Sequence, residues 1–191
     1  YDAWKLQQQM HWIADEVPMA DEVKDWKNVL TEPEKQLCTQ IFRFFTQADI
    51  EVHDCYIEKY LNKFKPNEVK MMLSAFANIE TVHQDAYSHL ISTLGMPDEI
   101  YQEFLNYKAM KDKYEYMHTF QTDTTEHLAL TMAGFGAFTE GLQLFASFAI
   151  LLNFQRFGKM KGMGQIIAWS VRDKAIHTDS IIRLFHTLIS E

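Results

Sequence analysis

The sequence predicts an all-α helical bundle. Only 7 glycines and 4 prolines interrupt its 191 residues. The long segments between them repeat apolar residues at alternating spacings of three and four, which is typical of helices packed side by side. With 47% hydrophobic and 23% charged residues, the composition fits one globular domain with a substantial core. We therefore expect a single domain over residues 1–191, with a short N-terminal segment at 1–31 and the bundle at 32–191.

Local signals set the expected helix boundaries. Thr31 is placed as an N-cap, Pro33 lies in the first turn and Glu34 occupies the capping-box position of a long helix. Pro66 begins the next helix, and Gly95 ends it. The expected helical segments are 1–12, 32–64, 66–95, a polar helix at 98–118, and then 123–157 and 163–190.

Charge, cysteine usage and hydropathy exclude several classes of protein. The net charge is −8 and no basic cluster stands out, which argues against nucleic-acid binding. Residues 128–155 are apolar enough for a membrane span, but Glu140 lies at their centre, so a buried helix is the better interpretation. Cys38 and Cys55 are expected on one helix, about 25 Å apart, and cannot form a disulfide with each other. Reduced thiols favour a cytoplasmic location.

Four of the predicted helices carry ionisable residues in the middle of an otherwise apolar stripe. Burial of an unpaired carboxylate costs several kcal/mol or forces it to take up a proton. A single interruption is better explained by a core histidine with a hydrogen-bond partner or by a buried ion pair than by a metal site. Four coincident interruptions instead favour a shared cation at the centre of the bundle. The residues are Asp49, Glu80 with His83, Glu140, and Lys174 with His177.

The order of these residues is nearly that of a dinuclear iron bundle. Such bundles take one carboxylate from each of two helices and a Glu-x-x-His motif from each of the other two. Here Glu80 and His83 have the i, i+3 spacing that places both on one helix face. Carboxylates combined with imidazoles suit iron or manganese. One position differs, because Lys174 stands three residues before His177, where a carboxylate would complete the pattern.

Tyr87 narrows the class of metal site. It lies four residues after His83, on the same face and one turn from the predicted metal. Its position predicts a phenol that a neighbouring oxidant converts to a radical. The alternative is a tyrosine that serves only to fill the core.

Five segments together resemble the radical-generating small (beta) subunit of class I ribonucleotide reductase: HWIADEV, FTQADIEVHD, ETVHQDAY, FTEGLQLFASF and VRDKAIH. The resemblance covers almost the whole chain. It implies a ferritin-like fold, usually a homodimer, and an oxidoreductase that is active only with a separate large (alpha) catalytic subunit. That subunit reduces ribonucleoside diphosphates to deoxyribonucleotides for DNA replication.

The resemblance also implies a role for each site residue. It makes Tyr87 the radical tyrosine and Trp12 the tryptophan that relays the electron. Asp173 links this tryptophan to the metal-site histidine. The metal ligands that it implies are Asp49, Glu80, His83, Glu140 and His177.

Lys174 departs from the family, which has a bridging glutamate at this position. Three central carboxylates remain, so two divalent metals together with the lysine would leave +5 against −3 in an apolar core. One divalent metal gives +3 against −3. We therefore interpret Lys174 as a fixed substitute for one cation, with its ammonium paired with Asp49 or Glu140.

This interpretation limits the cofactor. We expect at most one iron or manganese ion, held by Asp49, Glu80 and His83. The alternative is a metal-free protein with a tyrosyl or hydroxylated tyrosyl radical at Tyr87. Spontaneous assembly with iron and oxygen should be poor in either case, which makes an activating protein, for example a flavoprotein, a candidate partner.

Other functions share the same bundle. A ferritin-like diiron oxidase or oxygenase, or an iron-oxidising storage protein, would use a similar ligand set. The iron-oxidising storage protein requires neither Tyr87 nor the Trp12–Asp173 pair, and the oxidase or oxygenase would need a substrate cavity. A further alternative is an inactive bundle that only binds a partner, with Lys174 as the inactivating change.

Overall fold

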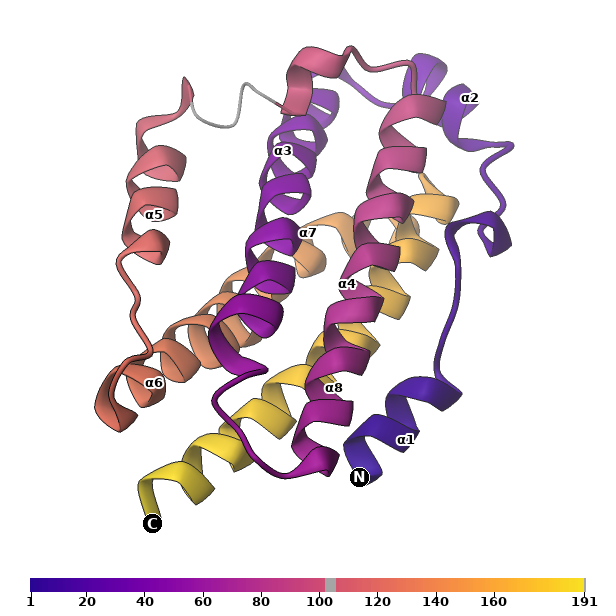
Figure 1. Ribbon diagram of the computed structural model, residues 1–191. Coiled ribbons are helices and arrows are strands. Elements are labelled where there is room, and N and C mark those ends of the chain that lie inside the picture. The colour runs from indigo at the N-terminus through magenta and orange to yellow at the C-terminus, as the bar shows by residue number, and fades with distance from the viewer. Residues whose placement is uncertain (102–105, 191) are drawn as a thin grey trace.

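The computed structural model describes residues 1–101 and 106–190, and long helices dominate these ranges (Figure 1). Two of the helical segments, η2 and η5, are π-helical, and η1 and η3 are 3-10 turns. The elements are α1 (Asp2–Gln9), η1 (Ala14–Glu16), α2 (Glu22–Asn28), α3 (Glu32–Asp54), η2 (Cys55–Tyr60), α4 (Asn67–Thr93), η3 (Asp98–Tyr101), α5 (Lys108–His118), α6 (Thr125–Met132), η5 (Ala133–Leu144), α7 (Phe145–Arg156) and α8 (Lys161–Ser190).

Most helices agree with the sequence-based expectation, and three details differ. The prediction of one polar helix at 98–118 is wrong, because Tyr107 has an extended backbone (φ −92°, ψ 115°) and α5 begins only after it. Residues 102–105 of that prediction lie outside the described residues. The helix that begins at Glu32 ends with the π-helical turn η2 at Tyr60 rather than at Phe64. Two short elements of the N-terminal segment, η1 and α2, carry no strong periodic signal and were not expected.

A layer of charged residues divides the core into two apolar clusters. α3, α4, the continuous α6–η5–α7 segment and α8 each contribute to both clusters. The first cluster contains Phe42, Phe45, Leu90, Leu151 and Ile167. The second contains Leu73, Phe76, Met132, Phe135 and Ile181. On each long helix the ionisable residue lies between the stretches that enter the two clusters, so the four helices bring these residues to one level.

Acidic side chains stabilise the starts of two long helices. Glu34 accepts a hydrogen bond from the backbone N–H of Thr31 at 2.7 Å, which confirms the predicted capping box of α3. The same carboxylate binds the ammonium of Lys159 at 2.7 Å. The buried carboxylate of Glu22 accepts hydrogen bonds from the backbone N–H groups of Gly162 (2.7 Å) and Met163 (3.2 Å), in the first turn of α8. These contacts fix the N-terminal segment and α3 against the start of α8.

Two glycines allow η5 to approach α8 closely. A Cβ atom on Gly136 would overlap the side chain of Ile181, and one on Gly141 would lie 2.8 Å from Cγ2 of Thr178. Within the described residues, the segment Thr125–Arg156 is the only helix long and apolar enough to cross a membrane by length and composition. In the bundle it packs along α8 and turns Glu140 into the interior.

The Glu34–Lys159 contact predicts a defined pH dependence. Lys159, together with the N–H and hydroxyl of Thr31, lowers the pKa of Glu34 from 4.5 to about 2. Because the folded pKa is the lower one, this stabilisation is complete above about 4.5 and is lost as the pH falls toward 2. We expect Glu34→Gln to destabilise the protein at pH 7 and to lose its effect near pH 2. Urea unfolding of both proteins across this range measures the difference. A difference that is independent of pH would contradict the assignment.

Candidate metal and radical site

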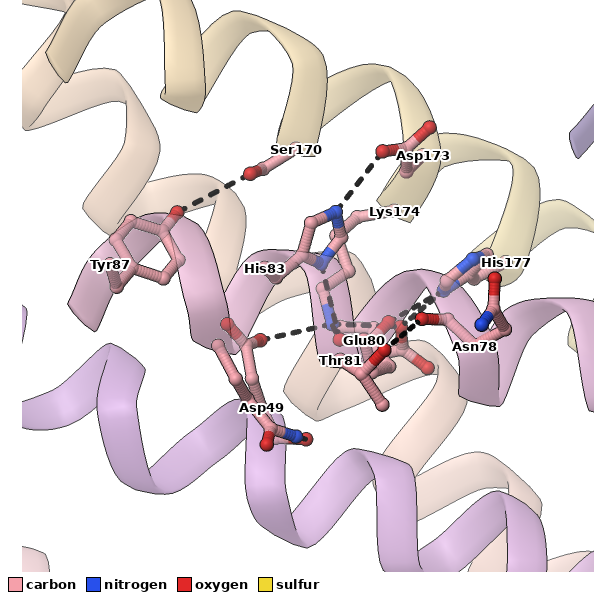
Figure 2. A network of polar contacts seen from close by, with 12 residues as sticks. Asp49, Asn78, Glu80, Thr81, His83, Tyr87, Ser170, Asp173, Lys174 and His177 are labelled. Carbon is pink, nitrogen blue, oxygen red and sulfur yellow. Dashed lines mark hydrogen bonds and ion pairs between the residues drawn. The ribbon is translucent and has the colours of Figure 1, made fainter. Parts of the chain in front are cut away.

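The six ionisable residues predicted from the apolar stripes converge at the centre of the bundle, and Figure 2 labels all of them except Glu140. Each is at most 2% exposed. They come from four separate helical segments: Asp49 from α3, Glu80 and His83 from α4, Glu140 from η5, and Lys174 and His177 from α8. The structure therefore brings these six residues together, as the apolar stripes predicted.

The ammonium of Lys174 lies among all three carboxylates. Its Nζ atom is 2.5 Å from Oε2 of Glu80, 3.2 Å from Oδ1 of Asp49 and 3.4 Å from Oε2 of Glu140. The expected pairing with Asp49 or Glu140 is present, but the closest partner is Glu80. This carboxylate belongs to α4, and a dashed line in Figure 2 joins it to the lysine ammonium.

Two groups of donor atoms have the composition of a metal site, and they share Glu80. The first is Asp49, Glu80 and His83, and the second is Glu80, Glu140 and His177; within each, the donor atoms lie within 4.8 Å of one another. This is the layout of a dimetal centre with a bridging carboxylate. Oε1 of Glu80 is buried without a hydrogen bond of good geometry, although Nδ1 of His177 is 3.0 Å away. The second group therefore offers a donor atom that Lys174 does not occupy, and its donors fit one metal ion.

The lysine controls the charge of the carboxylates around it. Burial alone would favour protonated Glu80, but the Lys174 ammonium and the His83 imidazole hold its pKa well below the ordinary value. Burial dominates at Asp49 and raises its pKa to about 6, against the opposing effect of Lys174. The three carboxylates in turn raise the pKa of Lys174 far enough to overcome its burial, so the ammonium stays charged.

Both imidazoles lie between acidic groups. Burial disfavours the charged form of His83, yet Glu80, Asp173 and Asp49 raise its pKa to about 10. The pKa of His177 is also raised, because Glu140 and Glu80 outweigh its burial. Without a metal, these shifts favour the charged form of both imidazoles, which together with Lys174 offset the negative charge of the buried carboxylates Asp49, Glu80, Glu140 and Asp173.

Tyr87 lies in an apolar environment beside this centre. It is 1% exposed and its ring packs against Phe45 at a centroid distance of 5.0 Å. Its hydroxyl donates only a long hydrogen bond, of 3.4 Å, to Oγ of Ser170 (Figure 2). Burial raises the pKa of Tyr87 well above the ordinary value, so the phenol keeps its proton.

Trp12, Asp173 and His83 form the connection that the resemblance implies. Nε1 of Trp12 donates to Oδ2 of Asp173 at 2.8 Å, and Nε2 of His83 lies 3.0 Å from the same oxygen. Arg172 is more distant, with its closest nitrogen 3.7 Å from Asp173. Asp173 is therefore bound mainly to the tryptophan and the histidine, and not in an ion pair with its neighbour in sequence.

Sequence reasoning missed two polar contacts of this centre. The hydroxyl of Tyr56 donates to Oε1 of Glu140 at 2.5 Å; its stripe position indicated burial but not this bond. The amide of Gln7 donates to Asp173 at 3.1 Å, and its oxygen lies 3.2 Å from Nε2 of His177. No periodic pattern marks Gln7, because it belongs to the short α1 helix.

Removal of the Lys174 charge should destabilise the fold. In Lys174→Met the side chain keeps a similar length, but three buried carboxylates lose their shared ammonium. Breaking a buried ion pair in this way costs about 3–5 kcal/mol. Urea unfolding in the presence of a chelator measures this loss, and added Mn(II) should recover part of it, since a metal can replace the missing charge.

Lys113→Met is the matched control. The Nζ atom of Lys113 is also buried, but it has no hydrogen-bond partner and contacts only the Phe44 ring, at 4.3 Å from the centroid. Loss of that contact should cost about 0.5–1 kcal/mol. Equal effects of the two substitutions would contradict a special role for the Lys174 charge.

The family comparison and the curated relatives agree on one family. The family described as ribonucleotide reductase, small chain, matches residues 1–191. Two proteins named as ribonucleoside-diphosphate reductase small subunits are 46% and 47% identical to the whole chain; they come from Invertebrate iridescent viruses 6 and 3. The chain spans 57% and 55% of the length of these relatives.

Solved structures show the same fold. The ribonucleotide reductase R2 subunit from Clostridium botulinum matches with a TM-score of 0.88 and 18% identity, over 96% of this chain and 59% of its own. The dimanganese(II)-NrdF from Streptococcus sanguinis matches with a TM-score of 0.86 and 20% identity, over 100% and 67%. The fold is thus the all-α, ferritin-like helical bundle of these subunits. From the family match over its whole length, the chain belongs to the ribonucleotide reductase small chain family.

Proposed function

We propose that this chain generates and stores a radical as the small subunit of a ribonucleoside-diphosphate reductase. The observation that carries the proposal is the continuous series of contacts Trp12–Asp173–His83–Glu80, which links an aromatic side chain to the central charged layer. The buried Tyr87 lies beside the same layer (Figure 2). A large catalytic subunit would receive the radical and reduce ribonucleotides.

The donor geometry favours one iron or manganese ion, in the group of Glu80, Glu140 and His177. Such an ion supplies one-electron redox chemistry with dioxygen or its reduced forms. The sequence suggested the group that contains Asp49 and His83. The shorter contacts of Lys174 go to Asp49 and to Oε2 of Glu80, however, so its charge opposes a second cation there. Oε1 of Glu80 and Nδ1 of His177 lie 3.0 Å apart and face the other group.

A metal-free centre is the second possibility, and the charges support it. The raised pKa values of His83 and His177 favour their charged forms, which together with Lys174 offset most of the carboxylate charge of the buried layer without a metal. In that case an external activating protein or oxidant would have to oxidise Tyr87, to an unmodified or a hydroxylated tyrosyl radical. A flavoprotein is one candidate for such a partner.

The environment of Tyr87 suits storage of a radical. Its ring is buried against Phe45, and its hydroxyl has only a long contact with Ser170. External reductants therefore cannot reach the phenol directly. Asp173 would hold the indole N–H of Trp12 and the ring of His83 in fixed orientations for the transfer step.

The proposal also covers assembly and location. The subunit would act as a homodimer with its large-subunit partner. Both cysteines are free and buried, which is consistent with the reducing cytoplasm.

An oxidase or oxygenase is less well supported, because all six central side chains are at most 2% exposed and an organic substrate would have to reach them.

Tyr87→Phe tests the radical assignment. The substitution removes one hydroxyl with a 3.4 Å hydrogen bond, so we expect a normal fold by circular dichroism. It should abolish the tyrosyl EPR signal of the activated protein and deoxyribonucleotide formation with the cognate large subunit. Tyr60→Phe is the control, because that buried phenol donates to the backbone carbonyl of Thr131 and contacts Cys55, and it has no hydrogen bond to the central charged residues. Full activity of the Tyr87 variant would refute the assignment.

Lys174→Glu tests the proposed metal count. It restores a fourth central carboxylate and removes the fixed positive charge, so two divalent metals become balanced. After reconstitution with excess Fe(II) or Mn(II) and gel filtration, we expect at most one tightly bound ion per wild-type chain and two in the variant, by elemental analysis. Two tightly bound ions in the wild-type protein would show that Lys174 does not substitute for a cation.

A further inference from the structure

Trp12 contacts a second tryptophan, Trp169 of α8. The ring centroids of the two indoles lie 5.1 Å apart with an interplanar angle of 51°. On its other side Trp12 packs against the His83 ring at 5.8 Å. Trp12 is only 2% exposed, whereas Trp169 is partly exposed. The three rings therefore form a continuous aromatic path from the charged centre to the surface.

The other two tryptophans of the chain do not join this path. Trp4 packs against Tyr1 at 5.5 Å, and Trp26 packs against Phe42 at 6.5 Å. Packing alone accounts for a contact between two indoles, which is worth about 0.5–1.5 kcal/mol beyond burial. Packing alone would be satisfied if the partner of the buried Trp12 were itself buried. A path for electrons, in contrast, requires that this partner reach solvent.

We propose that Trp169 is the outer end of the relay and the point at which an electron enters this subunit. The inference rests on the proposed function and extends it by one residue. One electron moves from Trp169 to the Trp12 radical cation, giving neutral Trp12 and a Trp169 radical cation. No bond is made or broken, and the indole N–H of Trp12 stays bonded to Asp173. A one-electron donor at the surface then reduces Trp169.

This step follows from how electron transfer depends on distance. The rate falls steeply as the gap between two redox groups increases, so rings in contact exchange electrons far faster than a buried ring and a donor in solvent. Because Trp12 is nearly inaccessible, a donor in solvent needs an intermediate group. Trp169 is such a group, since it touches Trp12 and carries the same readily oxidised indole.

The first experiment needs neither a metal nor a radical on Tyr87. Photogenerated tris(bipyridine)ruthenium(III) would oxidise the exposed side chains of the isolated protein, and peptide mass spectrometry would measure oxidation at each tryptophan. We expect oxidation of Trp12 despite its burial, and its loss in Trp169→Phe. Trp169→Tyr, which restores an oxidisable ring, should recover it. Trp26→Phe is the matched control and should leave Trp12 oxidation unchanged.

The second experiment uses the radical itself. Decay of the Tyr87 EPR signal in the presence of dithionite should be slower in Trp169→Phe than in the wild-type protein or in Trp26→Phe. Trp12 oxidation that persists in Trp169→Phe, or that is absent in the wild-type protein, would overturn the inference. A wild-type protein that forms no tyrosyl radical even with its activating protein or an added oxidant would instead refute the proposed function, and the ruthenium experiment alone would then decide the role of Trp169.

Discussion

The ammonium of Lys174 allows three carboxylates to share the centre of an apolar bundle. Each of these carboxylates comes from a different helical segment, and each lies within 3.4 Å of the same nitrogen atom. A single charge on α8 therefore joins α3, α4 and η5 at the level where the two apolar clusters separate. Without it, three buried negative charges would repel one another in a medium that screens them poorly.

Because Lys174 is a cation that belongs to the chain, it changes how much metal charge the centre needs for balance. A divalent ion held by Glu80, Glu140 and His177 would replace the proton of His177, so metal uptake would release a proton, as expected when an imidazole becomes a ligand. Lys174 supplies one positive charge that is common to the states with and without metal. A centre with four carboxylates has no such fixed charge and depends on its metals.

Much of this centre could be predicted from sequence, because ionisable residues within apolar stripes are costly unless they meet. The same argument located Asp49, Glu140 and the Glu80–His83 pair. Helical periodicity gives the face of a helix, but it does not resolve distances of a few tenths of an ångström. It therefore left the closest partner of Lys174 open. The break at Tyr107 and the π-helical form of η5 accompany tertiary contacts that periodicity does not foresee: Gln40 of α3 donates to the Tyr107 hydroxyl, and two glycines of η5 pack closely on α8.

Two buried phenols next to this centre, those of Tyr56 and Tyr87, differ in their hydrogen bonds. Tyr56 donates a 2.5 Å hydrogen bond to Glu140 and so fixes one oxygen of a candidate ligand. Tyr87 has only a 3.4 Å contact with a neutral hydroxyl. A phenol bound tightly to a carboxylate is coupled to the charge of the centre, and any change there acts on it. Among the described residues Tyr87 has no hydrogen bond to a charged group, although besides burial the charges of Asp49, Lys174 and Glu80 still act on its pKa. Under the proposed function, this weaker coupling suits storage of a radical, whereas the short contacts of Asp173 with Trp12 and His83 suit transfer.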